Sequence, residues 1–154
     1  MLELREAALA ILANTDPQSK VAQLFSLYDE YLAQRIAINA SNNFARNFTS
    51  QNIELPGRPP KPELVAPKFV PKRKMDTVEG RAILWHSLAH IEFNAMNLAL
   101  DAIWRFPNMP KSYYEDWLKV AKEESYHFSL INAHLQSFGF SYGVFPAHNS
   151  LWAV

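Results

Sequence analysis

Two long stretches of helical apolar periodicity, separated by a short proline-flanked turn, constrain the fold more than any other feature of this sequence. In the first, steps of three and four residues pass through Val78, Ala82, Trp85, Ala89, Glu92, Met96, Ala99, Ile103 and Phe106. In the second, they pass through Trp117, Ala121, Glu124, Phe128, Ile131, Leu135 and Phe138. This repeat is typical of helices that pack along a common seam. Because only Pro107-Asn108-Met109-Pro110 separates the stretches, residues 76–139 are predicted to form an antiparallel helical hairpin.

Residues that favour helix ends bound the two predicted long helices. Asp76 with Glu79, and Ser112 with Glu115, have the spacing of capping boxes, in which the first side chain caps the helix N-terminus. Gly139 suits the position just after a helix end. We therefore expect the first long helix to begin at the first capping box and the second to begin at the second.

Two further helices are predicted in residues 1–40. The segment from Leu2 to Asn14 is short and rich in Ala and Leu. Asp16 offers an N-cap and Pro17 suits the first helical position, so a second helix is predicted from there to about residue 40. No strand pattern competes with these helices. The predicted fold class is all-α, in one domain.

The segment between the two helix pairs, residues 41–75, is rich in proline and basic residues. Residues 55–74 hold six prolines and six Lys or Arg residues but one acid, which gives them a net charge of +5. Repeated proline excludes helix and central strand, so we expect an extended strap, held on an apolar surface by residues such as Leu64 and Val65. We expect its positive charge to hold it against the acidic remainder of the chain. The alternative is that the segment forms a basic surface that faces RNA. Residues 140–154 are predicted to form a C-terminal loop.

The composition narrows the class of protein. The absence of cysteine excludes disulfide scaffolds, zinc–thiolate sites, iron–sulfur clusters and thiol catalysis. Fifteen Lys and Arg residues balance fifteen Asp and Glu residues, so no overall attraction for nucleic acid or anionic membranes is indicated. No apolar run approaches the ~20 residues of a membrane span, and the first residues lack the basic region of a secretory signal. We therefore expect a cytoplasmic protein without a membrane partner.

One glutamate interrupts each apolar seam, Glu92 in the first helix and Glu124 in the second. Glu92 lies 16 residues before Asn108 at the centre of the turn, and Glu124 lies 16 residues after it. In an antiparallel hairpin, residues equidistant from the turn lie at the same level, so the two carboxylates should face each other. His127 follows Glu124 by three residues and lies about one turn away on the same side of the helix.

Two carboxylates facing each other inside an apolar seam are costly unless something compensates. One carboxyl can keep its proton, both can reach water, or both can bind a cation with the imidazole of His127. A Glu on one helix and Glu-x-x-His on the next form half the ligand set of di-iron and di-manganese helical bundles, and these ligands suit Fe or Mn. We favour a metal site formed by Glu92, Glu124 and His127. Glu123 is the rival of Glu124, but it lies off the seam and has Lys119 as a helix-surface partner.

His86 and His90 lie four residues apart on one face of the first long helix, away from the seam. The principal expectation is that they hydrogen-bond to the N-terminal helices or the strap. The alternative is that they orient the metal ligands from behind or contact a substrate.

The motifs of the hairpin and of the C-terminal loop resemble those of a known bacterial family. These motifs are His86-Ser-Leu-Ala-His90-Ile91-Glu92-Phe-Asn-Ala95, Asp101-Ala-Ile-Trp-Arg105-Phe106, Glu123-Glu124-Ser-Tyr-His127-Phe128, Phe145-Pro146-Ala147-His148 and Leu151-Trp152. The family is ferritin-like and of unknown function, and is similar in fold to non-haem di-iron oxygenases such as the tRNA hydroxylases. The resemblance implies a ferritin-like bundle with a carboxylate-bridged dinuclear centre, in which Glu92, Glu124 and His127 are metal ligands.

Members of that family continue into two further bundle helices, which carry a second Glu and a second Glu-x-x-His. This sequence supplies two carboxylates and one histidine, about half of a dinuclear ligand set. A homodimer through the hairpin seam would complete the set, as would the missing C-terminal half of a truncated chain, and truncation is favoured.

Two functional hypotheses follow from these ligands. The first is an O2-activating oxidoreductase with iron or manganese and an unidentified substrate. The alternative is a metal-free helical scaffold or binding protein, or an inactive fragment.

Overall fold

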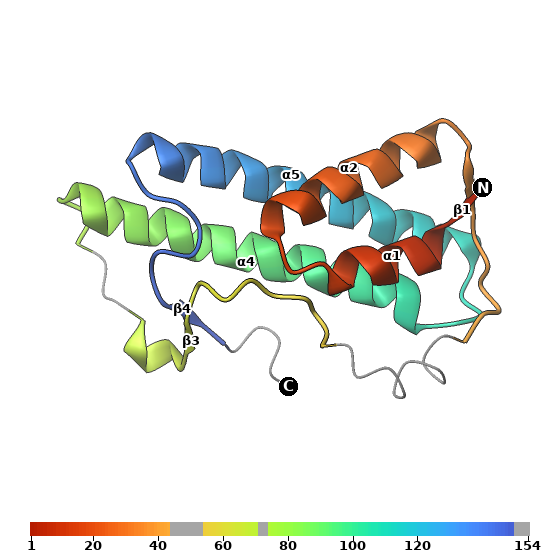
Figure 1. The fold of residues 1–154 in the computed structure, drawn as a ribbon, viewed down its shortest axis with the longest axis horizontal. Helices are drawn as coiled ribbons and strands as arrows, with labels where there is room; N and C mark the ends of the chain where they lie inside the picture. Colours follow the sequence, from red (N-terminus) through yellow and green to blue (C-terminus); the bar gives the residue numbers. More distant parts are fainter. Residues whose placement is uncertain (44–53, 71–73, 150–154) are drawn as a thin grey trace.

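The computed structural model describes residues 1–43, 54–70 and 74–149. This part of the chain is mainly helical, with helices α1 (Leu4–Ala13), α2 (Pro17–Leu32), α4 (Val78–Arg105) and α5 (Lys111–Ser137) and a short 3-10 helix, η1 (Pro67–Phe69). Four strands of two residues each complete it: β1 (Leu2–Glu3), β2 (Ile36–Ala37), β3 (Leu64–Val65) and β4 (Ala147–His148). The all-α prediction is confirmed (Figure 1). Among the described residues, no helix is both long enough and apolar enough to cross a bilayer.

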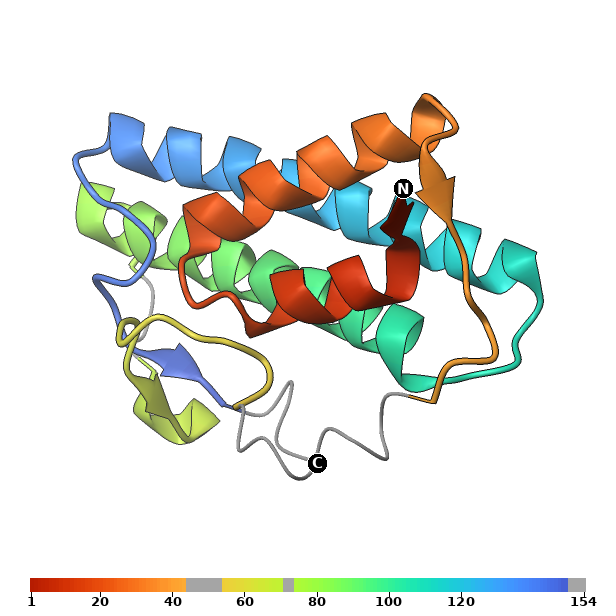
Figure 2. The same cartoon turned by 45° about the vertical axis from the view of Figure 1, so that its right-hand side comes forward.

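Helices α4 and α5 form the predicted antiparallel hairpin and run side by side along the molecule (Figures 1 and 2). Buried seam residues from both helices include Ala82, Ala89, Met96, Ala99, Ile103, Ala121, Phe128 and Leu135. The turn between the helices is closed locally. Asn108 takes the left-handed conformation with φ of 63°, and the Tyr114 hydroxyl donates to the Phe106 carbonyl at 2.6 Å.

Helices α1 and α2 cover one side of the hairpin, with α1 against α4 and α2 against α5. Two buried cations hold this arrangement. The guanidinium of Arg5 donates to the carbonyls of Ile103 and Trp104 at the end of α4 and to carbonyls of residues 39, 40 and 42. The Lys20 ammonium group donates to Asn97 Oδ1 at 2.6 Å and to the Gly57 carbonyl at 2.8 Å.

The capping predictions for the long helices are wrong in detail. Thr77, and not Asp76, caps α4, because its Oγ1 accepts from the backbone N–H of Gly80 at 2.9 Å. Helix α5 begins at Lys111 directly after Pro110 and has no side-chain cap, so Ser112 already lies inside the helix. The left-handed conformation of Gly139, with φ of 87°, is as expected after a helix end.

The second N-terminal helix is shorter than predicted. Its start is as predicted, because the side chain of Asp16 accepts from the Ser19 N–H. It ends at Leu32 and not near residue 40, because Gln34 adopts a left-handed conformation with φ of 61° and the chain turns back. The following strand β2 then pairs in parallel with β1.

The described part of the proline-rich segment, residues 54–70, is extended as predicted except at Pro67–Phe69, which form the 3-10 helix η1. Strand β3 pairs in parallel with β4 of the C-terminal loop (Figure 1). Gly57 donates to the Leu12 carbonyl at 2.8 Å, and a Cβ atom at Gly57 would lie 2.2 Å from the carbonyl oxygen of Ala13. Glycine is therefore needed where this segment crosses the end of α1. Residues 44–53, 71–73 and 150–154 lie outside the described residues, and with them the Leu151-Trp152 motif.

Candidate metal centre

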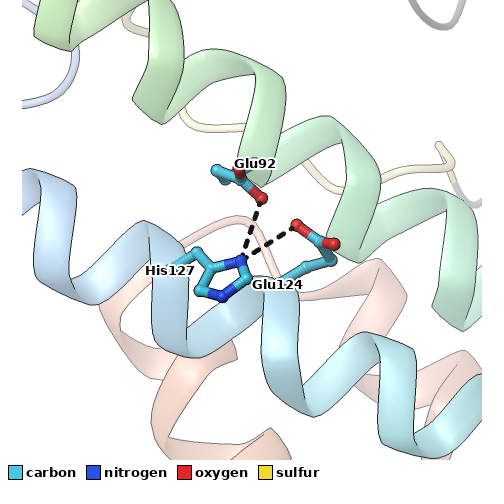
Figure 3. A group of neighbouring side chains, drawn as sticks. All are labelled: Glu92, Glu124 and His127. Carbon is cyan, nitrogen blue, oxygen red and sulfur yellow. Dashed lines mark ion pairs between the residues drawn. The ribbon is translucent and has the colours of Figure 1, made fainter.

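The structure brings Glu92 of α4 together with Glu124 and His127 of α5 (Figure 3). One ligand atom from each residue lies within 4.8 Å of the other two. His127 Nδ1 is 3.7 Å from Glu92 Oε2 and 3.6 Å from Glu124 Oε2. The level of the two glutamates follows from their equal spacing from the turn, and the helical repeat turns His127 toward the same point.

The cluster is open to solvent on one side and closed on the other. The side chains of Glu92 and Glu124 are 23% and 25% exposed, whereas that of His127 is 49% exposed. Glu92 Oε2 is nevertheless buried, and no described residue donates a hydrogen bond to it. A buried carboxylate oxygen without a donor is costly, and a bound cation would satisfy it.

The donor set fits a divalent transition metal. Two carboxylate oxygens and one imidazole nitrogen suit iron or manganese, and no thiolate is present to favour a softer metal. Three protein ligands leave coordination positions free for water, substrate or further ligands.

Exposed apolar side chains flank the open side of the cluster. They are Ile91 and Leu98 on α4 and Val120 and Leu130 on α5. At about 100° of rotation per residue, Val120 lies about 40° from Glu124, whereas Ile91 and Leu98 lie about 100° and 120° round α4 from Glu92. Helices α1 and α2 lie behind the hairpin in Figure 3 and do not cover this side. The three candidate ligands therefore lie beside a face of the hairpin that α1 and α2 leave uncovered and that carries exposed apolar side chains.

Comparison with known proteins places the sequence in a family. Residues 13–154 match the model of a protein family described as "Protein of unknown function (DUF455)". The chain belongs to the DUF455 family. It is 46% identical over 150 residues to an uncharacterized protein of Haemophilus influenzae, and the match covers 93% of this chain and 51% of that protein. The chain thus spans about half the length of the relative that it matches. No solved structure matches the sequence.

Glu123, the rival ligand of this DUF455 chain, is exposed and lies outside the cluster. His134, about two helical turns beyond His127 on α5, is also exposed, and its ring lies edge-on to Trp85 at 4.6 Å. The preference for Glu124 over Glu123 therefore agrees with the geometry, although the ligand role itself stays a prediction.

His86 and His90 lie apart from the cluster. Their expected partners were the N-terminal helices or the strap, but their hydrogen bonds go to the C-terminal loop. His86 Nε2 accepts from the backbone N–H of Gly143 at 2.9 Å. His90 Nε2 donates to the His148 carbonyl at 2.8 Å, and the Tyr142 hydroxyl lies 2.9 Å from His90 Nδ1. Burial lowers the pKa of both histidines to about 4, so both are neutral at physiological pH. They hold the loop on α4.

Two buried cations of the DUF455 chain were missed by the sequence analysis. Arg5 and Lys20 are both fully buried, and burial lowers the pKa of Lys20 to about 7. A signal for Lys20 was available, because Leu24 and Leu27 follow it at steps of four and three on the buried face of α2. No comparable signal marks Arg5, whose acceptors are backbone carbonyls distant in sequence.

Proposed function

We propose that Glu92, Glu124 and His127 bind a divalent redox metal, iron or manganese, and that the protein is an O2-dependent oxidoreductase of the ferritin-like, carboxylate-bridged type. One observation carries the proposal. Two helices direct three metal-ligating atoms to within 4.8 Å of one another, around a buried carboxylate oxygen to which no described residue donates a hydrogen bond. Structural carboxylates are normally satisfied by donors, so this arrangement is better explained by a cation than by packing.

The ligand set is completed by a second element on the uncovered side of the hairpin. A dinuclear centre in a helical bundle takes about four carboxylates and two histidines, twice what this chain supplies. The apolar side chains around the cluster, such as Ile91 and Leu130, provide a surface on which another helix pair can pack. That pair comes from further polypeptide of the kind that the longer Haemophilus relative has, or from a second copy of this chain.

The chain's own residues would position the metal and exclude water from it. Glu92 and Glu124 neutralise the charge of a divalent ion, and His127 contributes a neutral nitrogen ligand from the open side. The metal would supply the redox chemistry with O2. Packing of the second element against Ile91, Leu98 and Val120 would remove bulk water from the site and leave the free coordination positions to substrate.

Manganese binding tests the proposal directly. Titration of the purified protein with Mn(II), followed by the loss of the free-ion electron paramagnetic resonance signal, should show saturable binding. Glu124→Gln should weaken it at least tenfold, whereas Glu123→Gln, the adjacent exposed carboxylate, should leave it unchanged. Equal affinities for the two variants would overturn the assignment. Oxygen consumption by the Fe(II)-loaded protein then tests the redox part, and the mass in solution with and without metal tests assembly.

A metal-free helical scaffold is the second candidate. It is favoured by the exposed apolar face, which suits a partner helix whether or not a metal is present. A protein that binds no Mn(II) but forms a stable complex through this face would support the scaffold.

A further inference from the structure

A cavity of about 400 Å³ lies on the opposite side of α4 from the candidate metal centre. The extended segment 58–64 forms one wall, and Phe93 and Asn94 of α4 form the floor together with Tyr142. Because Asn94 follows Glu92 by two residues, its side chain points about 160° away from that of Glu92. The cavity is therefore separate from the carboxylate cluster.

The polar floor of this cavity is fixed by hydrogen bonds. The His148 carbonyl can only accept, so His90 Nε2 carries the proton and His90 Nδ1 accepts from the Tyr142 hydroxyl. Asn94 Nδ2 donates to the His90 carbonyl at 2.9 Å, which fixes the side-chain amide. No described residue donates to the Asn94 carbonyl oxygen, so the cavity offers a pre-oriented acceptor.

Arg58 brings a positive charge into the cavity wall. Its side chain is half-buried, and none of the carboxylates in the described residues forms an ion pair with it. Its charge acts on Tyr142 at the floor of the cavity and on Lys20. Burial raises the pKa of Tyr142 and the Arg58 charge opposes that rise, whereas for Lys20 burial lowers the pKa and Arg58 adds to the lowering. A half-buried guanidinium that has no ion-pair partner among the described residues favours an anionic ligand.

The rest of the lining limits the charge and shape of that ligand. Pro59, Pro60, Leu64 and Phe93 supply flat or apolar surface. Glu54 and Glu63, both exposed, also line the cavity, so a multiply charged anion would be repelled while an ammonium group would be attracted.

The geometry points to a binding site for a small monocarboxylate with an apolar body, whose carboxylate pairs with Arg58 and whose body lies against Phe93 and the proline wall. Large apolar amino acids are the simplest members of this class, because their ammonium group can interact with Glu54 or Glu63 and donate to the Asn94 carbonyl. Planar guanidinium groups bind carboxylates through two parallel hydrogen bonds, which gives the site orientation as well as charge selectivity.

Three related probes test the site by ligand-observed NMR titration of the full chain. They are 3-phenylpropionate, L-phenylalanine and 2-phenylethylamine, which share the ring and differ in charged groups. We expect saturable binding of 3-phenylpropionate and L-phenylalanine, with L-phenylalanine at least as tight, and at least tenfold weaker binding of 2-phenylethylamine. Absence of binding by both carboxylates, or equal binding of the amine, would overturn the proposal.

Variants locate the binding. Arg58→Gln should weaken 3-phenylpropionate binding at least tenfold, and its thermal unfolding curve should match that of the parent, since no described residue pairs with Arg58. Arg35→Gln is the matched control, because Arg35 is exposed and pairs only with Glu30 among the described residues. Equal weakening by both variants, or no weakening by Arg58→Gln, would overturn the assignment. Metal is absent throughout, so failure here leaves the proposed metal centre unaffected.

Discussion

Removal of one carboxylate from the cluster should stabilise the metal-free protein. At 4.8 Å, the limit on the separation of the ligand atoms, two unit charges repel by about 3 kcal/mol at an effective dielectric constant of about 20 and by about 1 kcal/mol in water. The side chains of Glu92 and Glu124 are about a quarter exposed, which reduces the repulsion toward the aqueous value. Glu124→Gln should therefore raise the free energy of unfolding by about 1 kcal/mol.

The assay is urea denaturation in low salt with a chelator present. The pH is held at 8 for the parent and for both variants. Glu123→Gln is the control, and as an exposed substitution it should change stability by less than about 0.5 kcal/mol. If Glu124→Gln instead destabilises the protein by about 1 kcal/mol or more, the carboxylates are held by favourable contacts within the fold, and the reasoning is refuted.

Two further substitutions probe the buried polar groups. Arg5→Met removes a fully buried guanidinium from the last carbonyls of α4, so urea denaturation should show a loss of at least about 3 kcal/mol; an unchanged value would contradict its structural role. Burial, with a smaller effect of the charge of His90, lowers the pKa of His86 to about 4, and its ring faces Tyr142 and the Gly143 N–H. As the pH falls, the His86 imidazole is therefore protonated in the unfolded chain before it is protonated in the folded protein. Neutral His86 costs the folded protein nothing above pH 6.5, but between pH 6.5 and pH 4 the free energy of unfolding falls by up to roughly 3 kcal/mol. His86→Gln should remove this loss from the pH profile of unfolding, and an unchanged profile would count against it.

The hairpin and its carboxylate pair could be predicted because both depend on local periodicity. A seam with steps of three and four residues fixes which face of each helix is buried, and the short turn fixes the level of each residue against the other helix. The meeting of Glu92 with Glu124 follows from these two facts alone.

Features that depend on contacts distant in sequence could not be predicted in the same way. The acceptors of Arg5 and the loop partners of His86 are backbone groups, and any residue type can supply a backbone group. Helix ends were misplaced for a different reason. Asp76 and Thr77 are both good N-cap residues, and the backbone after Pro110 begins the helix without a cap.

Anomalous diffraction tests the central claim most directly. Crystals of the protein grown with Mn(II) should give a strong anomalous difference peak above the manganese absorption edge, within coordination distance of Glu92, Glu124 and His127 Nδ1. The same experiment on Glu124→Gln should give no peak there. A wild-type map without a peak at these three side chains, in crystals that contain the metal at saturating concentration, would contradict the account.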